Sequence, residues 1–114
     1  SEQLIPLKVE GAGESALAAY TQANNLDPKN PSIPFAMARV YGVMGDNDNA
    51  AKLLEESLTL KGNFEPALYQ YGLLKLGEKD TKTAIQALGT AVQINQNNAN
   101  ALYYLSLALA QEGR

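Results

Sequence analysis

Three alanines of this 114-residue chain are separated by one interval, because Ala16, Ala50 and Ala84 each lie 34 residues from the next. Larger residues follow at the same step: Tyr20, Leu54 and Leu88. A period of this length is typical of arrays in which each unit stacks on its neighbours and shares one continuous core. The sequence therefore predicts a repeat protein.

Within each period, apolar residues return at helical spacing twice, with a polar break between the two series. Each unit is therefore predicted to be a hairpin of two helices. The predicted helices span residues 14–26, 32–44, 48–60, 66–76, 81–94 and 99–112. Several breaks carry helix-start signals, since Asp46 and Asp80 can cap helices and Pro66 suits a first turn.

One segment carries a family pattern as well as the period. Its residues are Leu68, Tyr71, Gly72 and Lys75, then Ala84, Leu88 and Ala91. The segment resembles the tetratricopeptide repeat, whose pattern runs Trp-x2-Leu-Gly-x2-Tyr and then Ala-x3-Phe. The resemblance covers residues 14–114. It implies an all-α fold, a right-handed superhelical array of antiparallel helix hairpins, with about three repeats and a half repeat at each end.

Two further expectations concern local structure. The repeated alanines lie where paired helices should cross most closely, with Gly72 and Ala38 facing them from the other helix. Residues 1–13 are expected to form an extended N-terminal arm, because Ile5, Leu7 and Val9 alternate with polar or helix-breaking residues.

Composition excludes most reactive chemistry. The chain has no Cys and no His, so it lacks thiol nucleophiles, the usual zinc ligands and the usual neutral-pH proton shuttle. The motif Gly11-Ala-Gly13 opens a helix, but no acidic residue follows about twenty positions later, as a dinucleotide site requires. We therefore expect no enzyme, cofactor or metal site.

Nine basic residues are scattered among twelve acidic ones, so nucleic acid is not an expected partner. The longest apolar run, 101–110, is about half of a membrane span, so membrane insertion is not expected and the compartment stays open.

The resemblance implies that the first helix of each unit lines a concave groove that binds an extended or helical segment of a partner protein. The implied groove residues are Phe35, Arg39, Val43, Tyr69, Gln70, Leu73, Asn100, Tyr103, Tyr104 and Leu107. Some family members hold a carboxyl terminus through several cationic and amide residues, but only Arg39 supplies a cation here. The expected ligand is therefore apolar or aromatic, anchored by Phe35, Tyr69 and Tyr103, and the expected function is that of a scaffold or adaptor.

An alternative function is structural self-assembly. Three leucines of the last helix, Leu102, Leu105 and Leu109, have no second helix to cover them, and the first unit lacks its own first helix. The last helix could be a cap, the chain could be part of a longer array, or copies could pair through these ends. Ile5 and Leu7 of the arm are further candidates for self-association, as a possible homo-oligomer contact.

Overall fold

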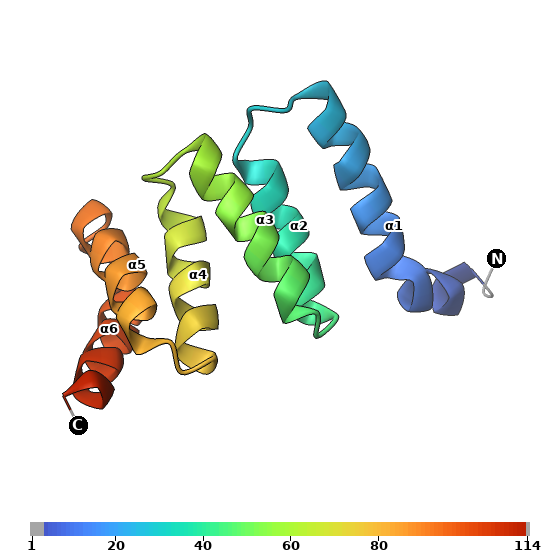
Figure 1. Cartoon of the computed structure of the whole chain (residues 1–114). Helices are drawn as coiled ribbons and strands as arrows, with labels where there is room; N and C mark the ends of the chain where they lie inside the picture. The colour runs from blue at the N-terminus through green and yellow to red at the C-terminus, as the bar shows by residue number, and fades with distance from the viewer. Residues whose placement is uncertain (1–3, 114) are drawn as a thin grey trace.

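A computed structural model describes the backbone of residues 4–113 and the side chains of residues 11–113. Six helices follow one another along the chain (Figure 1): α1 (Leu4–Leu26), α2 (Ser32–Val43), α3 (Asn47–Leu60), α4 (Glu65–Gly77), α5 (Thr81–Ile94) and α6 (Ala99–Glu112). No strand occurs within residues 4–113. The all-α prediction is confirmed, and the bounds of α2 to α6 agree with it to within one residue at each end.

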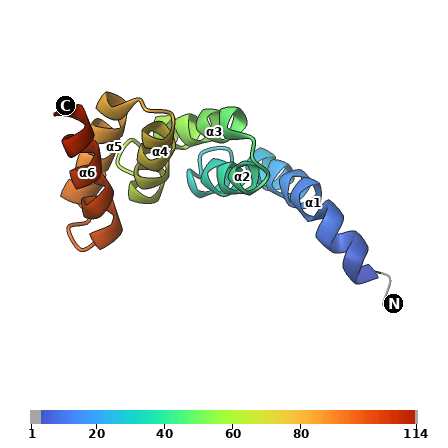
Figure 2. The same ribbon diagram turned by 90° about the horizontal axis from the view of Figure 1, so that it is seen from below.

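Neighbouring helices pack side by side and antiparallel, and the array is elongated (Figures 1 and 2), with extents of 55 × 29 × 25 Å. α2 pairs with α3 and α4 pairs with α5, while α6 packs against α5 and also touches α4. The predicted array of helical hairpins is thereby confirmed. None of the helices within residues 4–113 has the length and apolar character to cross a membrane.

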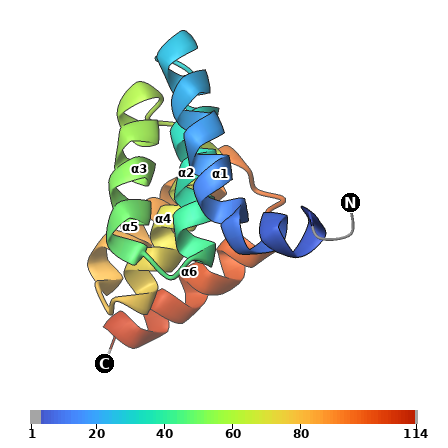
Figure 3. The ribbon, with the colours of Figure 1, turned by 90° about the vertical axis from the view of Figure 1, so that its right-hand side faces the viewer.

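The N-terminal region differs from the prediction. α1 begins at Leu4, so an extended arm is wrong for residues 4–13. Pro6 lies in the first turn of α1, where a backbone N–H has no partner within the helix, and it therefore does not break the helix. The first turns of α1 bend away from α2 (Figure 3). Residues 1–3 lie outside the described residues, as do the side chains of Ile5 and Leu7.

Small residues bring the paired helices together, as predicted. Ala50 and Ala84 are almost fully buried, whereas Ala16 is only half-buried because no earlier helix covers it within the described residues. Gly72 is also buried, but its nearest neighbour is Leu88 and not Ala84. A Cβ atom at Gly72 would lie 2.6 Å from Leu88 Cγ. At this point α4 and α5 approach each other through a glycine on one helix and a leucine on the other.

Polar contacts hold the starts of α2 and α6 in place. The hydroxyl of Ser57 on α3 is fully buried and donates to the carbonyl of Pro31, the N-cap of α2, at 2.8 Å. Asn98 caps α6 by accepting from the Ala101 N–H, and its amide donates to Glu65 at the start of α4 at 2.7 Å. The first bond fixes the start of α2 on α3 within one hairpin, and the second fixes the start of α6 against the preceding unit.

Candidate functional site

The structure brings four of the predicted groove residues together in one hollow between α2, α3 and α4. The hollow has a volume of about 430 Å³. Its lining residues are Ala38, Arg39, Gly42, Val43, Asn47, Ala50, Leu54, Gln70, Leu73 and Leu74. We call this the α2–α4 hollow. Arg39, Val43, Gln70 and Leu73 were expected there, and they come from the first helices of two successive units.

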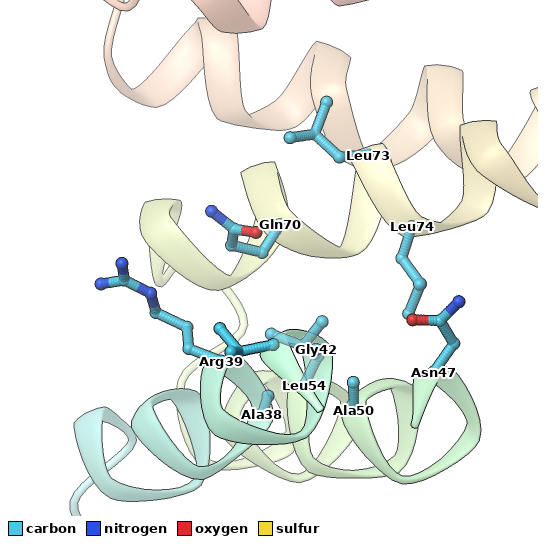
Figure 4. A pocket seen from close by; sticks show the side chains of 10 residues that line it. Ala38, Arg39, Gly42, Asn47, Ala50, Leu54, Gln70, Leu73 and Leu74 are labelled. Carbon is cyan, nitrogen blue, oxygen red and sulfur yellow. The ribbon is translucent and has the colours of Figure 1, made fainter. Parts of the chain in front are cut away.

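The α2–α4 hollow has an apolar floor and polar groups at its ends (Figure 4). Ala38, Ala50 and Leu54 form the floor and are buried in one core cluster. Arg39 and Gln70 lie at one end, while Asn47 lies beside Leu74 at the other. Such a surface can bury an apolar side chain and hydrogen-bond to the backbone or to a carboxylate beside it.

Three predicted tyrosines lie along α4 and α6. The rings of Tyr103 and Tyr104 meet edge to face, with centroids 5.0 Å apart, and Tyr103 is 62% exposed. Tyr69 packs against the cluster of Leu68, Ala87 and Ala91. Burial is the main cause of the raised pKa of Tyr69, and the charges of Tyr104 and Glu65 raise it further. Tyr69 is therefore partly structural, and Tyr103 is the accessible ring.

Three other predicted groove residues lie outside the α2–α4 hollow. Phe35 meets Phe64 edge to face at 5.7 Å and packs against the core, so its ring stabilises the junction of α2 with the α3–α4 turn. Asn100 and Leu107 lie on exposed surface of α6. Phe35 was expected as an anchor because the family resemblance places its position in the groove, but that position does not distinguish an outward ring from one that packs against the next turn.

A second hollow, of about 560 Å³, lies between α1 and α2. We call it the α1–α2 hollow, and its lining residues are Ala12, Gly13, Glu14, Ala16, Tyr20, Ala36, Arg39, Val40, Val43 and Met44. Arg39 and Val43 line both hollows. Most of these residues were not singled out as site residues, although the 34-residue step relates them to the first hollow: Gly13, Ala16 and Tyr20 correspond to Asn47, Ala50 and Leu54.

A third hollow, of about 470 Å³, lies between α1 and α3 and is lined mainly by polar side chains such as Lys52, Glu55, Glu56 and Thr59. Beyond it, Tyr71 donates its hydroxyl to Glu55 Oε2 at 2.9 Å, and the Lys75 ammonium lies 5.3 Å from the centre of the Tyr71 ring. Burial, followed by the hydrogen bond to Glu55, raises the pKa of Tyr71. Tyr71, Glu55 and Lys75 are therefore paired with one another. Among the described side chains, no three acidic, His or Cys residues gather as a metal site would require.

Comparison with known proteins agrees with this architecture. Residues 65–98 match the family model of the tetratricopeptide repeat. Over 76 residues, the chain is 40% identical to cellulose synthase operon protein C of Pseudomonas fluorescens (strain SBW25), a match that covers 67% of this chain and 6% of that protein. The crystal structure of MamA superposes with a TM-score of 0.81 at 25% identity, covering 93% of this chain and 62% of that one.

A further solved structure is the first such domain of Spaghetti (RPAP3) bound to an HSP90 peptide. It superposes with a TM-score of 0.84 at 18% identity, covering 99% of this chain and 92% of that one. The chain thus spans only a small part of the curated relative and less than two thirds of MamA, but nearly the whole of this domain. Residues 65–98 are thus a tetratricopeptide repeat, and the six helices of the described residues have the fold of about three such repeats. Tetratricopeptide repeat domains are protein–protein interaction modules.

Proposed function

We propose that this domain is a scaffold or adaptor that captures an extended or helical segment of a partner protein, with an apolar side chain of that segment seated in the α2–α4 hollow. The observation that carries the proposal is the meeting of Arg39, Val43, Gln70 and Leu73 from two units over one apolar floor. No bond is made or broken in this function.

The hollow offers both affinity and orientation. Burying apolar surface contributes roughly 25 cal/mol per Å², so one leucine or phenylalanine side chain seated on the floor contributes about 1.5–3 kcal/mol. Arg39 presents a planar fork of donors and Gln70 an amide at the same end of the hollow. An Arg fork matches a carboxylate in two parallel hydrogen bonds. The favoured ligand therefore carries an apolar side chain with an acidic residue close to it.

We propose that the exposed ring of Tyr103, on α6, extends this binding surface. Aromatic residues are enriched among the side chains that dominate binding energy at interfaces. We propose that Tyr103, flanked by Tyr69 and Tyr104, contacts a second apolar residue of the same ligand. Asn100 and Leu107 lie on the same helix and are proposed as the rim of this contact.

The proposed ligand shares apolar and acidic residues with the HSP90 peptide SRMEEVD bound by the Spaghetti domain, but we expect it to bind through an acidic side chain and not through a chain terminus. At 18% identity that neighbour supports the fold alone. Where a carboxylate clamp needs several cations and amides from adjacent repeats, this chain has Phe35, Arg39, Pro66, Gln70 and Asn100, of which only Arg39 is a cation. A single cation, Arg39, suits one acidic side chain better than a chain terminus that needs several donors.

A selection from a random peptide library displayed on phage, carried out on the wild-type domain, tests the proposal. We expect the selected peptides to share an apolar residue near an acidic one. Val43→Asp places a negative charge in the hollow, at a residue that is 89% exposed, and this charge repels the acidic residue of the ligand; Arg39→Ala removes the cation without opening the core. Each variant should bind the selected peptide at least about tenfold more weakly by fluorescence anisotropy, a loss of about 1.4 kcal/mol.

The matched control is Thr59→Ala, an exposed residue lining the third hollow, which should bind as the wild type does. Tyr103→Ala should weaken binding of those peptides that carry two apolar residues. Unchanged affinity of both Val43→Asp and Arg39→Ala would place the binding surface elsewhere and reject the α2–α4 hollow.

A further inference from the structure

The structure points to a second interaction surface, and we propose that its occupant is a second copy of this chain: α6 of one copy docks in the α1–α2 hollow of the next, head to tail. The inference goes beyond peptide capture, because it concerns the two ends of the array. It assigns the alternative function, self-assembly, to one contact: α6 of one copy packs against α1 and α2 of the other.

The first step is that the α1–α2 hollow is the α2–α4 hollow moved back by one repeat. Subtracting 34 from the α3 and α4 residues of the α2–α4 hollow gives six residues, all of which line the α1–α2 hollow: Gly13, Ala16, Tyr20, Ala36, Arg39 and Val40. The remaining wall of the α2–α4 hollow is α2 itself, with Ala38, Gly42 and Val43. The α1–α2 hollow has no helix in the place that α2 takes in the α2–α4 hollow, among the described residues. A helix of a neighbouring molecule could fill that place.

The second step is that α6 has the right residues for that wall. Adding two repeat steps to the α2 residues of the α2–α4 hollow leads to Ser106, Leu107, Ala110 and Gln111 of α6. All four are exposed in the single chain. They are small or uncharged, so α6 can approach α1 as closely as α2 approaches α3.

The third step concerns the leucines. In the complete unit, Leu68 of α4 is buried in a cluster with Ala87 and Ala91 of α5. The equivalent residues at the two ends of the array are Leu102 of α6, which is 50% exposed, and Ala19 and Ala23 of α1. Ala19 is exposed and Ala23 is half-buried. The leucine of this contact therefore lies at one end of the array and the alanines lie at the other. Docking of two copies would bring Leu102 of one copy onto Ala19 and Ala23 of the next.

Ser106 occupies the position of Gly72, and it would face Tyr20, which occupies the position of Leu88. A Cβ atom is compatible with that position, because Ala38 fills it in α2 and packs in one buried cluster with Leu54. The described lining of the hollow contains one acidic and one basic residue, Glu14 and Arg39, and α6 contributes no charge before Glu112. The first turns of α1 bend away from α2 (Figures 1 and 3).

The symmetry of the contact predicts how it grows. In the docked pair, Ala16 of the second copy takes the place that follows Ala84 in the 34-residue series. The second copy therefore continues the array in phase. The two surfaces differ, which makes the contact heterologous, and a heterologous contact that does not close forms open chains. Mass should therefore rise with concentration without stopping at a dimer.

Two blocked variants test the contact by sedimentation velocity and light scattering between micromolar and millimolar concentrations. Leu102→Lys/Leu109→Lys blocks the α6 end, at two leucines that are half exposed. Ala12→Lys/Ala36→Lys blocks the hollow, at residues outside the buried core. Each variant alone should remain a monomer of about 12.2 kDa. An equimolar mixture should form a one-to-one dimer and no larger species, because each variant keeps one intact surface.

Gln93→Lys, an exposed position on α5, is the matched control and should associate as the wild type does. Circular dichroism and thermal unfolding establish that the blocked variants are folded. A wild-type chain that stays monomeric at every concentration overturns the proposal, and so does a mixture that stays monomeric while the wild type associates. Dimers of the hollow-blocked variant alone would show that α6 pairs with α6 and would also overturn it. Peptide capture through the α2–α4 hollow is measured separately and survives any of these outcomes.

Discussion

Gly45 and Lys79, one repeat apart, adopt the same left-handed backbone conformation, with φ of 84° and 67°. Each lies between the two helices of a hairpin, directly before the aspartate that caps the second helix. The turn thus imposes the same backbone geometry on both units. Glycine adopts it without steric cost, while a lysine suffers the clash of its Cβ with the backbone.

Lys79→Gly is therefore expected to stabilise the domain. The left-handed conformation costs a non-glycine residue about 1–2 kcal/mol, and the extra chain entropy of glycine offsets part of the gain. The free energy of unfolding should rise by about 0.5–1 kcal/mol in urea titrations. Gly45→Ala should lower it by about 1 kcal/mol. Lys82→Gly, in the first turn of α5, serves as the control and should destabilise. A loss of stability in Lys79→Gly would contradict the strain argument.

Two glycines inside helices should respond to alanine in opposite directions. At Gly72 the new Cβ would press into Leu88, which is fully buried, so Gly72→Ala should destabilise by about 1–3 kcal/mol. At Gly89, on α5, a Cβ would meet nothing within 4 Å. Gly89→Ala should therefore stabilise by about 0.5–1 kcal/mol through helix propensity. Thermal unfolding of both variants checks the contrast, and equal shifts would argue against the close approach of α4 and α5.

Ser57→Ala should loosen the start of α2 on α3. The variant removes a buried hydroxyl that donates to the Pro31 carbonyl, which keeps a weaker bond from the Phe35 N–H at 3.3 Å. We expect a loss of about 1 kcal/mol in unfolding free energy. Ser106→Ala removes an exposed hydroxyl that bonds only within its own helix, and it should change stability by less than about 0.5 kcal/mol. Amide exchange that stays slow at Ile33 and Phe35 in Ser57→Ala would speak against this role.

Acid should weaken the start of α3 through Asp46. Hydrogen bonds from the Asn49 side chain and backbone lower the pKa of Asp46 below its ordinary value of 3.8. A lowered pKa in the folded state means that this contribution to stability is complete above about pH 4 and is lost as the pH falls through the lower folded value. Asp46→Asn can still cap the helix but does not titrate. Stability measured between pH 5 and pH 2 should fall more steeply in the wild type than in Asp46→Asn, and parallel profiles would refute the assignment.

Tyr71 contributes to the stability of the domain at alkaline pH. Burial and the hydrogen bond to Glu55 raise its pKa above 10.0, so its contribution to stability is complete below that pH and is lost as the pH rises through the higher folded value. The pKa of Tyr69 is raised as well, so absorbance near 295 nm should show late tyrosine ionisation from both residues, and Tyr71→Phe should remove part of it. Tyr69→Phe is the comparison and should remove the other part. Late ionisation of unchanged amplitude in Tyr71→Phe would contradict the burial of the Tyr71 hydroxyl.

Helices α2 to α6 were predictable because each carries its own helical spacing and its own boundary residues, such as Asp46, Asp80 and Pro66. Residues 14–26 of α1 were predicted as well, but residues 4–13 were not, because Pro6 and the glycines at 11 and 13 are as compatible with an extended arm as with the first turns of a helix. Arg39, Val43, Gln70 and Leu73 could be placed in the candidate site because repeat position decides which face of a helix a residue occupies. Phe35 shares that face, but its packing depends on Phe64, a residue from another turn.

The sequence by itself determined the repeat, the helical hairpins and the absence of Cys and His, because local spacing and composition act without knowledge of neighbours. Only the tertiary structure decided that Gly72 meets Leu88, that two hollows repeat at one step, and that α6 leaves its leucines half exposed. Such features arise from the distance between helices and from their crossing, and both depend on the side chains of two or more segments at once.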